Sequence, residues 1–293
     1  MDAEKEKRAI QYLKAFEPKS EPYYLCYSGG KDSDVIRILA SLAGVKHDIV
    51  NNHTTVDAPE TVRYIRSIPD VQIELPKETM WQLIVKKGMP PTRIVRYCCA
   101  ALKERGGMGR VKITGVRKDE SYSRSVNNEL ITVIGKPKTT AKLAEDEGVN
   151  FSIAPKGGIV LNDDNDESRR FVERCYRTTS TMINPIIDWT TSDVWEFLHH
   201  YGCESNPLYQ RGFSRVGCIG CPLGGFLSMK REFALYPKYK ENYIRAFDRM
   251  IAKRIENGKP TQWGSGKDVF TWWVGDDPMQ LTLDDYDEDW YKL

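Results

Sequence analysis

The sequence lacks long apolar stretches, and this limits the classes of protein to which it can belong. No apolar run approaches the roughly 20 residues that a membrane-spanning helix requires. The opening segment MDAEKEKRAI is too highly charged for a secretion signal, so we expect a cytoplasmic protein that does not contact a membrane. No internal repeat is present, which excludes a repeat architecture.

A strong net charge is also lacking. The 43 Lys and Arg residues nearly balance the 41 Asp and Glu residues, so the formal net charge is only +2. Any case for nucleic-acid binding must therefore depend on local clusters of charge. With 40% hydrophobic and 29% charged residues, the 293-residue chain has the composition of a soluble globular protein. It is long enough for one large domain or two smaller ones.

Cysteine is scarce but unevenly placed. The total is seven, an odd number in a chain without a recognisable secretion signal, so we do not expect a disulfide framework. Metal binding or redox chemistry becomes the better explanation. The cysteines are Cys26, Cys98, Cys99, Cys175, Cys203, Cys218 and Cys221.

The stretch from 23 to 42, YYLCYSGGKDSDVIRILASL, has the pattern of a strand, a glycine turn and a helix. Its apolar start fits a central strand of a parallel sheet. Gly29 and Gly30 allow positive φ and a close approach to a ligand, and Asp32 or Ser33 can cap the helix. Free amides and the helix dipole then favour an anion, with Lys31 adding a positive charge. The alternative is an ordinary glycine turn.

This turn is not a Walker A loop, because Leu25 stands where that motif needs glycine and Asp32 where it needs Ser or Thr. Nor does it match a dinucleotide fingerprint. The six residues SGGKDS resemble the PP-loop of the ATP pyrophosphatase superfamily. That resemblance implies a protein that holds an adenosine nucleotide and acts at its α-phosphate, or at a group attached to it.

Strands and helices alternate along the first half of the chain. Apolar runs at 46–52, 71–75 and 111–116 predict further strands, and this alternation predicts a Rossmann-like α/β fold, a parallel sheet with helices on both faces. Ligands in such sheets lie beyond the carboxyl ends of the strands. Asp57 and Glu60 are therefore candidates for the site, although DAPET is also an ordinary helix start. Arg117 and Arg124 follow the strand at 111–116 and should face the nucleotide.

The domain organisation is less regular after residue 124. We expect a PP-loop domain over 1–228, with an insertion at about 125–183 and a cysteine loop at 202–225, and a helical region with an acidic tail over 229–293. The segment 184–200 should form a short strand and then a helix capped by Thr191 or Ser192. A solvated loop explains the acids in the insertion better than a cation site does. These acids are Asp163, Asp164, Asp166 and Glu167.

Two pairs of cysteines have spacings that suit metal binding. Cys218 and Cys221 form a C-x-x-C motif in a glycine-rich loop, and Cys98 and Cys99 are adjacent. Four thiolates suit either tetrahedral zinc or a [4Fe–4S] cluster. Adjacent cysteines strain a compact zinc site more than a cluster whose corner irons are spread apart, so the cluster is favoured. Buried structural thiols are a third explanation.

Several motifs together resemble the phosphoadenosine phosphosulfate reductase-like family over about residues 20–225. They are SGGKDS, Cys98 with Cys99, GVRKDESYSR, NPIIDWTTSDVWEFL and GCIGCP. The cysteine pattern is similar to that of the adenosine phosphosulfate reductase branch, where such cysteines hold a [4Fe–4S] cluster. The resemblance implies nucleotide binding, a phosphate or sulfate end held by basic residues, and catalytic roles for Lys31, Asp32 and Arg117. The implied nucleotide-binding set is Ser28, Gly29, Gly30, Lys31, Asp32, Ser33, Asp57, Gly115 and Arg117, with Arg124 and Arg211 on the substrate.

The sequence departs from the reductases in its last part. Those enzymes carry a nucleophilic cysteine in a C-terminal ECGLH-like motif, and no cysteine follows Cys221 here. Carboxylates cannot replace a thiolate in that attack. One hypothesis is therefore that ATP binds with Mg²⁺ and is cleaved between its α- and β-phosphates to adenylate an acceptor. In another, ATP is replaced by a sulfonucleotide (APS or PAPS), which is attacked by Cys203, Cys175 or the thiol of a partner protein.

A third hypothesis is a nucleotide- and cluster-binding subunit of a larger complex, without turnover of its own. The segment 229–259 contains nine Lys or Arg residues and four acids, a local charge of +5, together with three tyrosines. Such a segment is suited to following a phosphate backbone, so nucleic acid is a possible partner. A solvated helix balancing the acidic tail is the alternative. A sulfur donor or reductant protein is a further possible partner.

Overall fold

The computed structural model describes residues 2–127, 129–134, 137–146, 148–153, 159–162 and 180–276. The chain divides into two compact units. The first contains 1–52, 59–74 and 105–216, and the second contains 53–58, 75–104 and the chain from 217 onward. The boundary expected near residue 228 stays a prediction.

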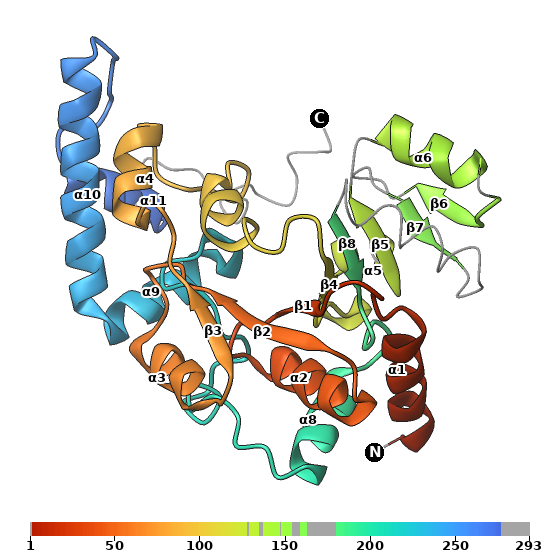
Figure 1. The fold of residues 1–293 in the computed structure, drawn as a ribbon. Coiled ribbons are helices and arrows are strands. Elements are labelled where there is room, and N and C mark those ends of the chain that lie inside the picture. The colour runs from red at the N-terminus through yellow and green to blue at the C-terminus, as the bar shows by residue number, and fades with distance from the viewer. Residues whose placement is uncertain are drawn as a thin grey trace, which may run out of the picture. The chain divides into compact units, whose positions relative to one another are not determined.

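The first unit is built on one eight-stranded sheet, with the order β3-β2-β1-β4-β8-β5-β7-β6 (Figure 1). Neighbours from β3 to β8 pair in parallel, and β5, β7 and β6 extend the sheet in antiparallel pairs. The predicted α/β fold is confirmed. The strands are β1 (Tyr23–Cys26), β2 (His47–Asn52), β3 (Val71–Glu74), β4 (Val111–Ile113), β5 (Ile131–Ile134), β6 (Phe151–Ile153), β7 (Ile159–Leu161) and β8 (Ser180–Ile183).

Apolar residues explain why the central strands form here. Tyr23, Tyr24 and Leu25 of β1 are all at most 2% exposed, as expected for a strand covered on both faces. The expected strand after residue 184 lies earlier, since β8 ends at Ile183. Asn184 instead terminates this strand, with its side-chain amide bonded to Glu129 O at 2.7 Å.

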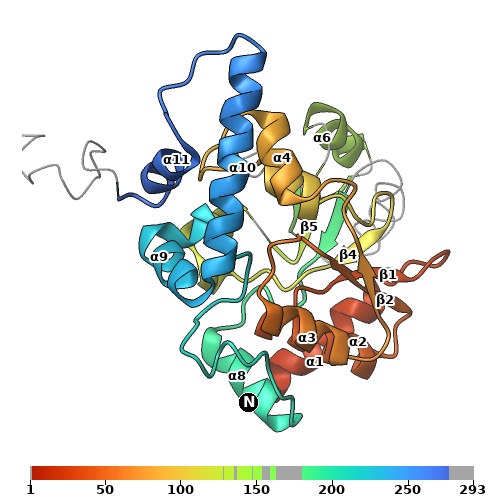
Figure 2. The same ribbon diagram turned by 90° about the vertical axis from the view of Figure 1, so that its left-hand side faces the viewer.

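Four helices of the first unit lie on one face of the sheet (Figures 1 and 2). Their apolar sides join the main core, which also contains the buried Trp189. The cap of the last helix is Thr190, one residue before the predicted position, and its side chain accepts from Asp193 N. These helices are α1 (Ala3–Ala15), α2 (Lys31–Ala43), α3 (Pro59–Ser67) and α8 (Thr191–His200).

The insertion expected at 125–183 supplies the antiparallel part of the sheet. Here β5 pairs with β8, and β7 pairs with both β5 and β6. The short helices α5 (Tyr122–Asn127) and α6 (Pro137–Asp146) belong to the same part of the chain, and a turn of 3₁₀-helix covers Lys118–Glu120. The acidic segment 163–167 lies outside the described residues, as does Cys175.

The second unit is helical and has an aromatic core. Phe233, Tyr243 and Trp273 are buried and contact one another, with ring centres 4.7 to 5.8 Å apart. The predicted helical segment 229–259 is two helices rather than one, because Pro237 has no amide to continue the first. The helices are α4 (Met80–Lys87), α9 (Gly225–Leu235), α10 (Pro237–Glu256) and α11 (Gly266–Trp273).

The cysteine pair lies in an unusual turn. Cys99 begins a single turn of π-helix, Cys99–Lys103, and Cys98 is its N-cap residue. Such turns are rare and are frequent at functional sites. The described part of the chain contains no helix long and apolar enough to cross a membrane.

Candidate functional site

The turn between β1 and α2 has the geometry of an anion-binding loop. Gly29 has φ +72°, and a Cβ on it would lie 2.7 Å from Ile65 Cγ1, so only glycine fits. Gly30 caps α2 without a side chain. Ser33 Oγ accepts from Gly30 N at 3.1 Å and lies 3.3 Å from Ser28 Oγ. The loop is thus fixed by its own hydroxyls at the positive end of a 13-residue helix.

Two residues that the sequence reasoning missed hold this loop. Tyr209 Oη accepts from Lys31 N at 2.9 Å, and Lys31 Nζ lies 5.7 Å from the centre of the Tyr209 ring. Asn206 is fully buried and donates to Gly29 O at 3.0 Å. These partners are 178 and 177 residues apart in sequence, so no local pattern could have indicated them.

Asp32 bridges two cations beside the loop. Its Oδ1 accepts from Arg117 Nε at 2.7 Å, and its Oδ2 lies 3.3 Å from Lys31 Nζ. The Arg117 side chain is only 1% exposed, and its Nη1 also donates to Asp119 Oδ2 at 3.2 Å and Trp189 O at 3.1 Å. Arg117 therefore positions Asp32, and its contact with a phosphate or sulfate stays a prediction.

The loop after β4 approaches the same place. A Cβ on Gly115 would lie 2.9 Å from Asp32 O, so glycine permits this close approach. Burial and the positive charge of Arg215 lower the pKa of Arg124, while the negative charge of Asp32 raises it. Arg124 also pairs with Glu120. Arg215 was not among the predicted residues, and its charge adds to a positive region around Asp32.

Arg211 projects from the segment that carries Tyr209. Its Nη1 is paired with Glu60 Oε1 at 2.7 Å, and its side chain is 56% exposed. Glu60 lies in the first turn of α3. The sequence placed both residues in the site, and the structure shows that they bind each other. Contact between Arg211 and a substrate stays a prediction.

Asp57 belongs to the second unit. Its Oδ2 accepts from Thr54 N at 2.8 Å and lies 4.0 Å from His53 Nε2. Its backbone forms an isolated bridge with Cys218. The predicted role of Asp57 in nucleotide binding remains a prediction, and its observed neighbour is a cysteine.

All four cysteines of the predicted cluster lie in the second unit and affect one another electrostatically. A hydrogen bond between the adjacent thiols raises the pKa of Cys98 and lowers that of Cys99. Negative charge on Cys218 and Cys221 raises the pKa of Cys98 further. Burial raises the pKa of Cys218, whose Sγ lies 3.4 Å from Thr54 Oγ1.

Lys103 interacts electrostatically with these thiols. Negative charge on Cys218, and then on Cys221, raises the pKa of Lys103, which lies at the end of the π-helix. Within the described ranges, however, no three His, Cys, Asp or Glu side chains are grouped tightly enough to hold a metal ion. The thiols therefore share one region without converging on a single point.

The packing of the C-x-x-C loop requires a glycine between its two cysteines. Gly220, between Cys218 and Cys221, has φ +72°, and a Cβ there would lie 2.5 Å from Phe233 Cζ. Its amide donates to Glu232 Oε2 at 2.6 Å. The sequence therefore needs glycine at this position for the loop to lie against the aromatic core.

Cys203 lies apart from these four, in the first unit. It lines a cavity of about 1110 Å³, and Arg37 Nη2 lies 3.9 Å from its Sγ. Burial and the negative charge of Asp34 raise the pKa of Cys203, so its thiol is held protonated. This protonation disfavours Cys203 as a nucleophile.

A comparison with known protein families decides the family. The pattern of the phosphoadenosine phosphosulfate reductase domain matches residues 22–223, which is more than half of the chain. The chain belongs to this family. The resemblance inferred from SGGKDS and the cysteine spacing is thereby confirmed.

Two uncharacterized proteins of Methanocaldococcus jannaschii are similar to this family member over most of its length. They are 27% and 24% identical, each over 83% of this chain, and the matches cover 45% and 53% of those proteins. The chain thus spans about half the length of these relatives. An adenosine 5'-phosphosulfate reductase of Anoxybacillus flavithermus is 43% identical over only 51 residues, 17% of this chain and 22% of that protein.

The similarity to solved structures is weak. A phosphoadenylyl-sulfate reductase from Candida auris aligns with a TM-score of 0.41 and 15% identity, over 74% of this chain and 96% of that one.

Proposed function

We propose that this family member binds ATP at the PP-loop and cleaves it between the α- and β-phosphates to adenylate an acceptor in a sulfur-transfer reaction. The observation that carries the proposal is the loop Ser28–Ser33 at the start of α2, with Gly29 at positive φ. Backbone amides, the helix dipole and Lys31 are suited to the β- and γ-phosphates of ATP, which enters with Mg²⁺.

The reaction would require few protein groups. An acceptor oxygen attacks the α-phosphorus and loses its proton, the bond to the bridging oxygen of the β-phosphate breaks, and pyrophosphate leaves. Positioning and electrostatic stabilisation supply most of the catalysis. Arg117 fixes Asp32, and Asp32 in turn orients Lys31, so this buried chain of ion pairs would hold the lysine ready for the leaving group.

The four cysteines of the second unit would hold a [4Fe–4S] cluster. Their chemistry fits, because thiolates are the usual ligands of such a cluster. A zinc ion, which needs a compact tetrahedron of ligands, is the alternative. When bound, the cluster would supply a site that binds or tunes sulfur. Lys103 would offset part of the negative charge of these ligands.

The test of the nucleotide site is ATP binding with Mg²⁺ by calorimetry, followed by pyrophosphate release in the presence of candidate acceptors. Lys31→Met should weaken ATP binding by about tenfold or more, because it removes a charge-assisted contact to phosphate. Lys46→Met, an exposed lysine of the same unit, should change it less than about twofold. Equal affinities of the two variants would contradict the proposal.

Sulfite release from APS or PAPS would favour reduction of a sulfonucleotide over adenylation. The candidate thiols inside the chain are then Cys203 and Cys175, and Cys203→Ser or Cys175→Ser should abolish the release. ATP binding without turnover in any mixture would instead favour a binding subunit of a larger complex.

The test of the cluster is anaerobic purification with measurement of iron, sulfide and absorption near ~400 nm. Cys99→Ser and Cys221→Ser should each lose most of the iron, whereas Cys26→Ser, in β1 of the other unit, should keep it. Stoichiometric zinc without colour would assign the thiols to the alternative metal and reject the cluster.

A further inference from the structure

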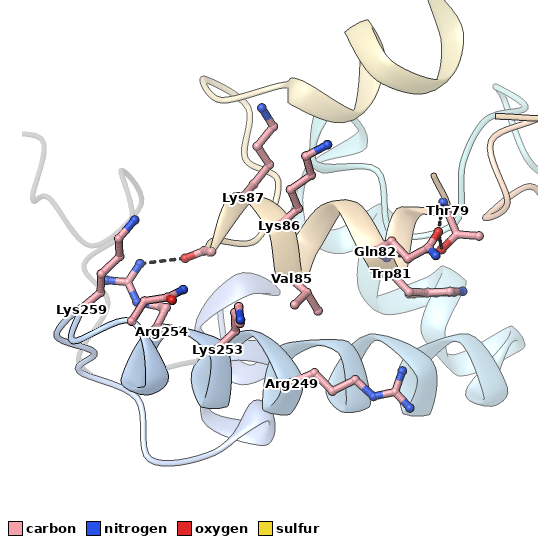
Figure 3. Close-up of a pocket in the computed structure, with 12 residues that line it drawn as sticks. Thr79, Trp81, Gln82, Val85, Lys86, Lys87, Arg249, Lys253, Arg254 and Lys259 are labelled. Atoms are coloured by element: carbon pink, nitrogen blue, oxygen red, sulfur yellow. Dashed lines mark hydrogen bonds between the residues drawn. The ribbon is translucent and has the colours of Figure 1, made fainter. Parts of the chain in front are cut away.

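A basic groove lies along α4 and α10 in the second unit (Figure 3). Its volume is about 740 Å³, far larger than one phosphate group, and none of its twelve lining residues is acidic. Six of them are cations that come from both helices and from the segment after α10. They are Lys86, Lys87, Arg249, Lys253, Arg254 and Lys259.

Besides Arg254, three of these six cations have charges that no described acidic side chain neutralises. Lys87, Arg249 and Lys259 form no ion pair with any residue that the structure describes. Lys86 and Lys253 each have one exposed acidic partner, Glu78 at 2.9 Å and Glu256 at 2.7 Å. Exposed pairs of this kind contribute little to stability. The groove therefore keeps an excess of positive charge that the fold does not use.

Arg254 differs from the other cations because it donates hydrogen bonds to backbone carbonyls. Its guanidinium donates to Gly88 O at 2.8 Å and to Pro260 O, which ties the end of α4 to the end of α10. Figure 3 shows Arg254 reaching the carbonyl that ends α4, while Lys86 and Lys87 extend away from the helices. Arg254 thus fixes the shape of the groove, while Lys87, Arg249 and Lys259 have no ion-pair partner among the described residues.

The polar residues of α10 are spaced to follow a chain of charges. Arg249, Lys253 and Asn257 lie at intervals of four residues on one side of the helix and span about 12 Å along its axis. This length suits a few consecutive phosphates of a nucleic-acid strand, which within a duplex follow one another at ~3.4 Å of axis per phosphate. Half-buried Trp81, beside Arg249, offers an aromatic surface at one end.

We propose that this groove binds the phosphate backbone of a single-stranded nucleic acid. Cations in rows over two helices suit a polyanion, and a tryptophan among them suits the exposed base of a single strand. The inference goes beyond the proposed reaction, because it assigns a second ligand to the chain. Its test does not depend on ATP cleavage.

The experiment measures binding of the full chain to a fluorescently labelled 20-nucleotide single strand by anisotropy, at several salt concentrations. The test variant is Lys87→Gln with Arg249→Gln, because neither residue has an ion-pair partner within the described ranges. We expect its affinity to fall by about tenfold or more at low salt. The slope of log affinity against log salt should decrease by about 1.4, since two phosphate contacts are lost.

The matched control is Lys238→Gln with Lys267→Gln, two exposed lysines of the same unit outside the groove. It removes the same charge and should change the affinity by less than about twofold. Equal loss in both variants would show a general charge effect and overturn the proposal. Tighter binding to duplex DNA, or to anionic lipid vesicles, would also overturn it.

Discussion

Asp34 is a buried carboxylate whose hydrogen-bond donors are two tyrosine hydroxyls. It is 0% exposed and accepts from Tyr27 Oη at 2.6 Å and Tyr64 Oη at 3.0 Å. Burial raises its pKa to about 6, against the opposing effect of these hydrogen bonds. The ionised form is thus disfavoured in the folded chain relative to the unfolded one.

This raised pKa makes stability depend on pH in a defined direction. Between about pH 4 and pH 6 the folded chain binds more protons at Asp34 than the unfolded chain, so the free energy of unfolding falls as pH rises through this range. Asp34→Asn removes this titration. Relative to the natural protein, the variant should gain about 2–3 kcal/mol between pH 4 and pH 7, measured by urea unfolding. A pH-independent difference would contradict the assignment.

Gly29 and Gly44 offer a matched pair at the two ends of α2. Both have positive φ, +72° and +67°, but a Cβ at Gly44 would meet nothing within 4 Å. Gly44→Ala should therefore cost only the left-handed backbone term, about 1–2 kcal/mol. Gly29→Ala should cost about 1–3 kcal/mol more, because its methyl group collides with Ile65.

Thermal or urea unfolding of the two glycine variants checks this expectation. Gly29→Ala should also weaken ATP binding, whereas Gly44→Ala should leave it unchanged. Similar free energies of unfolding for the two variants would mean that the loop shifts to accommodate the methyl group at position 29, which would contradict this expectation.

The secondary structure followed from the sequence where local patterns decide it. The strand at 23–26 and the helix after Gly30 were predicted correctly, because a buried apolar run and a glycine turn are local signals. Pro237, which has no amide, is a local signal for the break between α9 and α10. The π-helix at Cys99–Lys103 has no comparable signal, since its neighbours fit an ordinary helix equally well.

The candidate site was less predictable than the strands. SGGKDS and the cysteine spacings indicated the two groups, but Tyr209 and Asn206 reach the loop only through the fold. Arg117 was predicted to meet the ligand; the structure shows its guanidinium donating to Asp32, and its contact with a ligand stays a prediction. Basic residues near a phosphate loop have the same sequence pattern whether they bind ligand or protein.

The sheet changes from parallel to antiparallel pairing at β8, and Asn184 supports this junction. Its side chain is fully buried, accepts from Thr114 Oγ1 and donates to Glu129 O at 2.7 Å. Asn184→Ala should lower the free energy of unfolding by about 2–3 kcal/mol, because buried polar partners are left unsatisfied.

The matched control for this junction is Asn162→Ala. Asn162 lies just after β7 and makes an exposed hydrogen bond to Asn150, at 2.9 Å. Its loss should cost at most about 0.5 kcal/mol. Equal costs for both variants in chemical unfolding would show that the junction does not depend on Asn184.

At the scale of the whole molecule, the two units separate two kinds of chemistry. The first contains the PP-loop and the second contains the four cysteines and the basic groove. ATP with Mg²⁺ should therefore slow amide hydrogen exchange at residues 28–36 and leave α10 and α11 unchanged, because a ligand stabilises most the region that it contacts. Protection spread evenly over both units would contradict this separation.

The hydroxyl of Tyr209 accepts a hydrogen bond from the amide of Lys31, the first residue of α2. A bound phosphate oxygen would use the same amide as its donor. Phosphate entry at that amide must therefore displace Tyr209, whose ring lies edge-on to Trp195 with centres 5.0 Å apart. The indole of Trp195 would lose its aromatic neighbour Tyr209 when the phosphate binds. If the loop binds a nucleotide as proposed, the emission of Trp195 should change on binding, which stopped-flow fluorescence can measure.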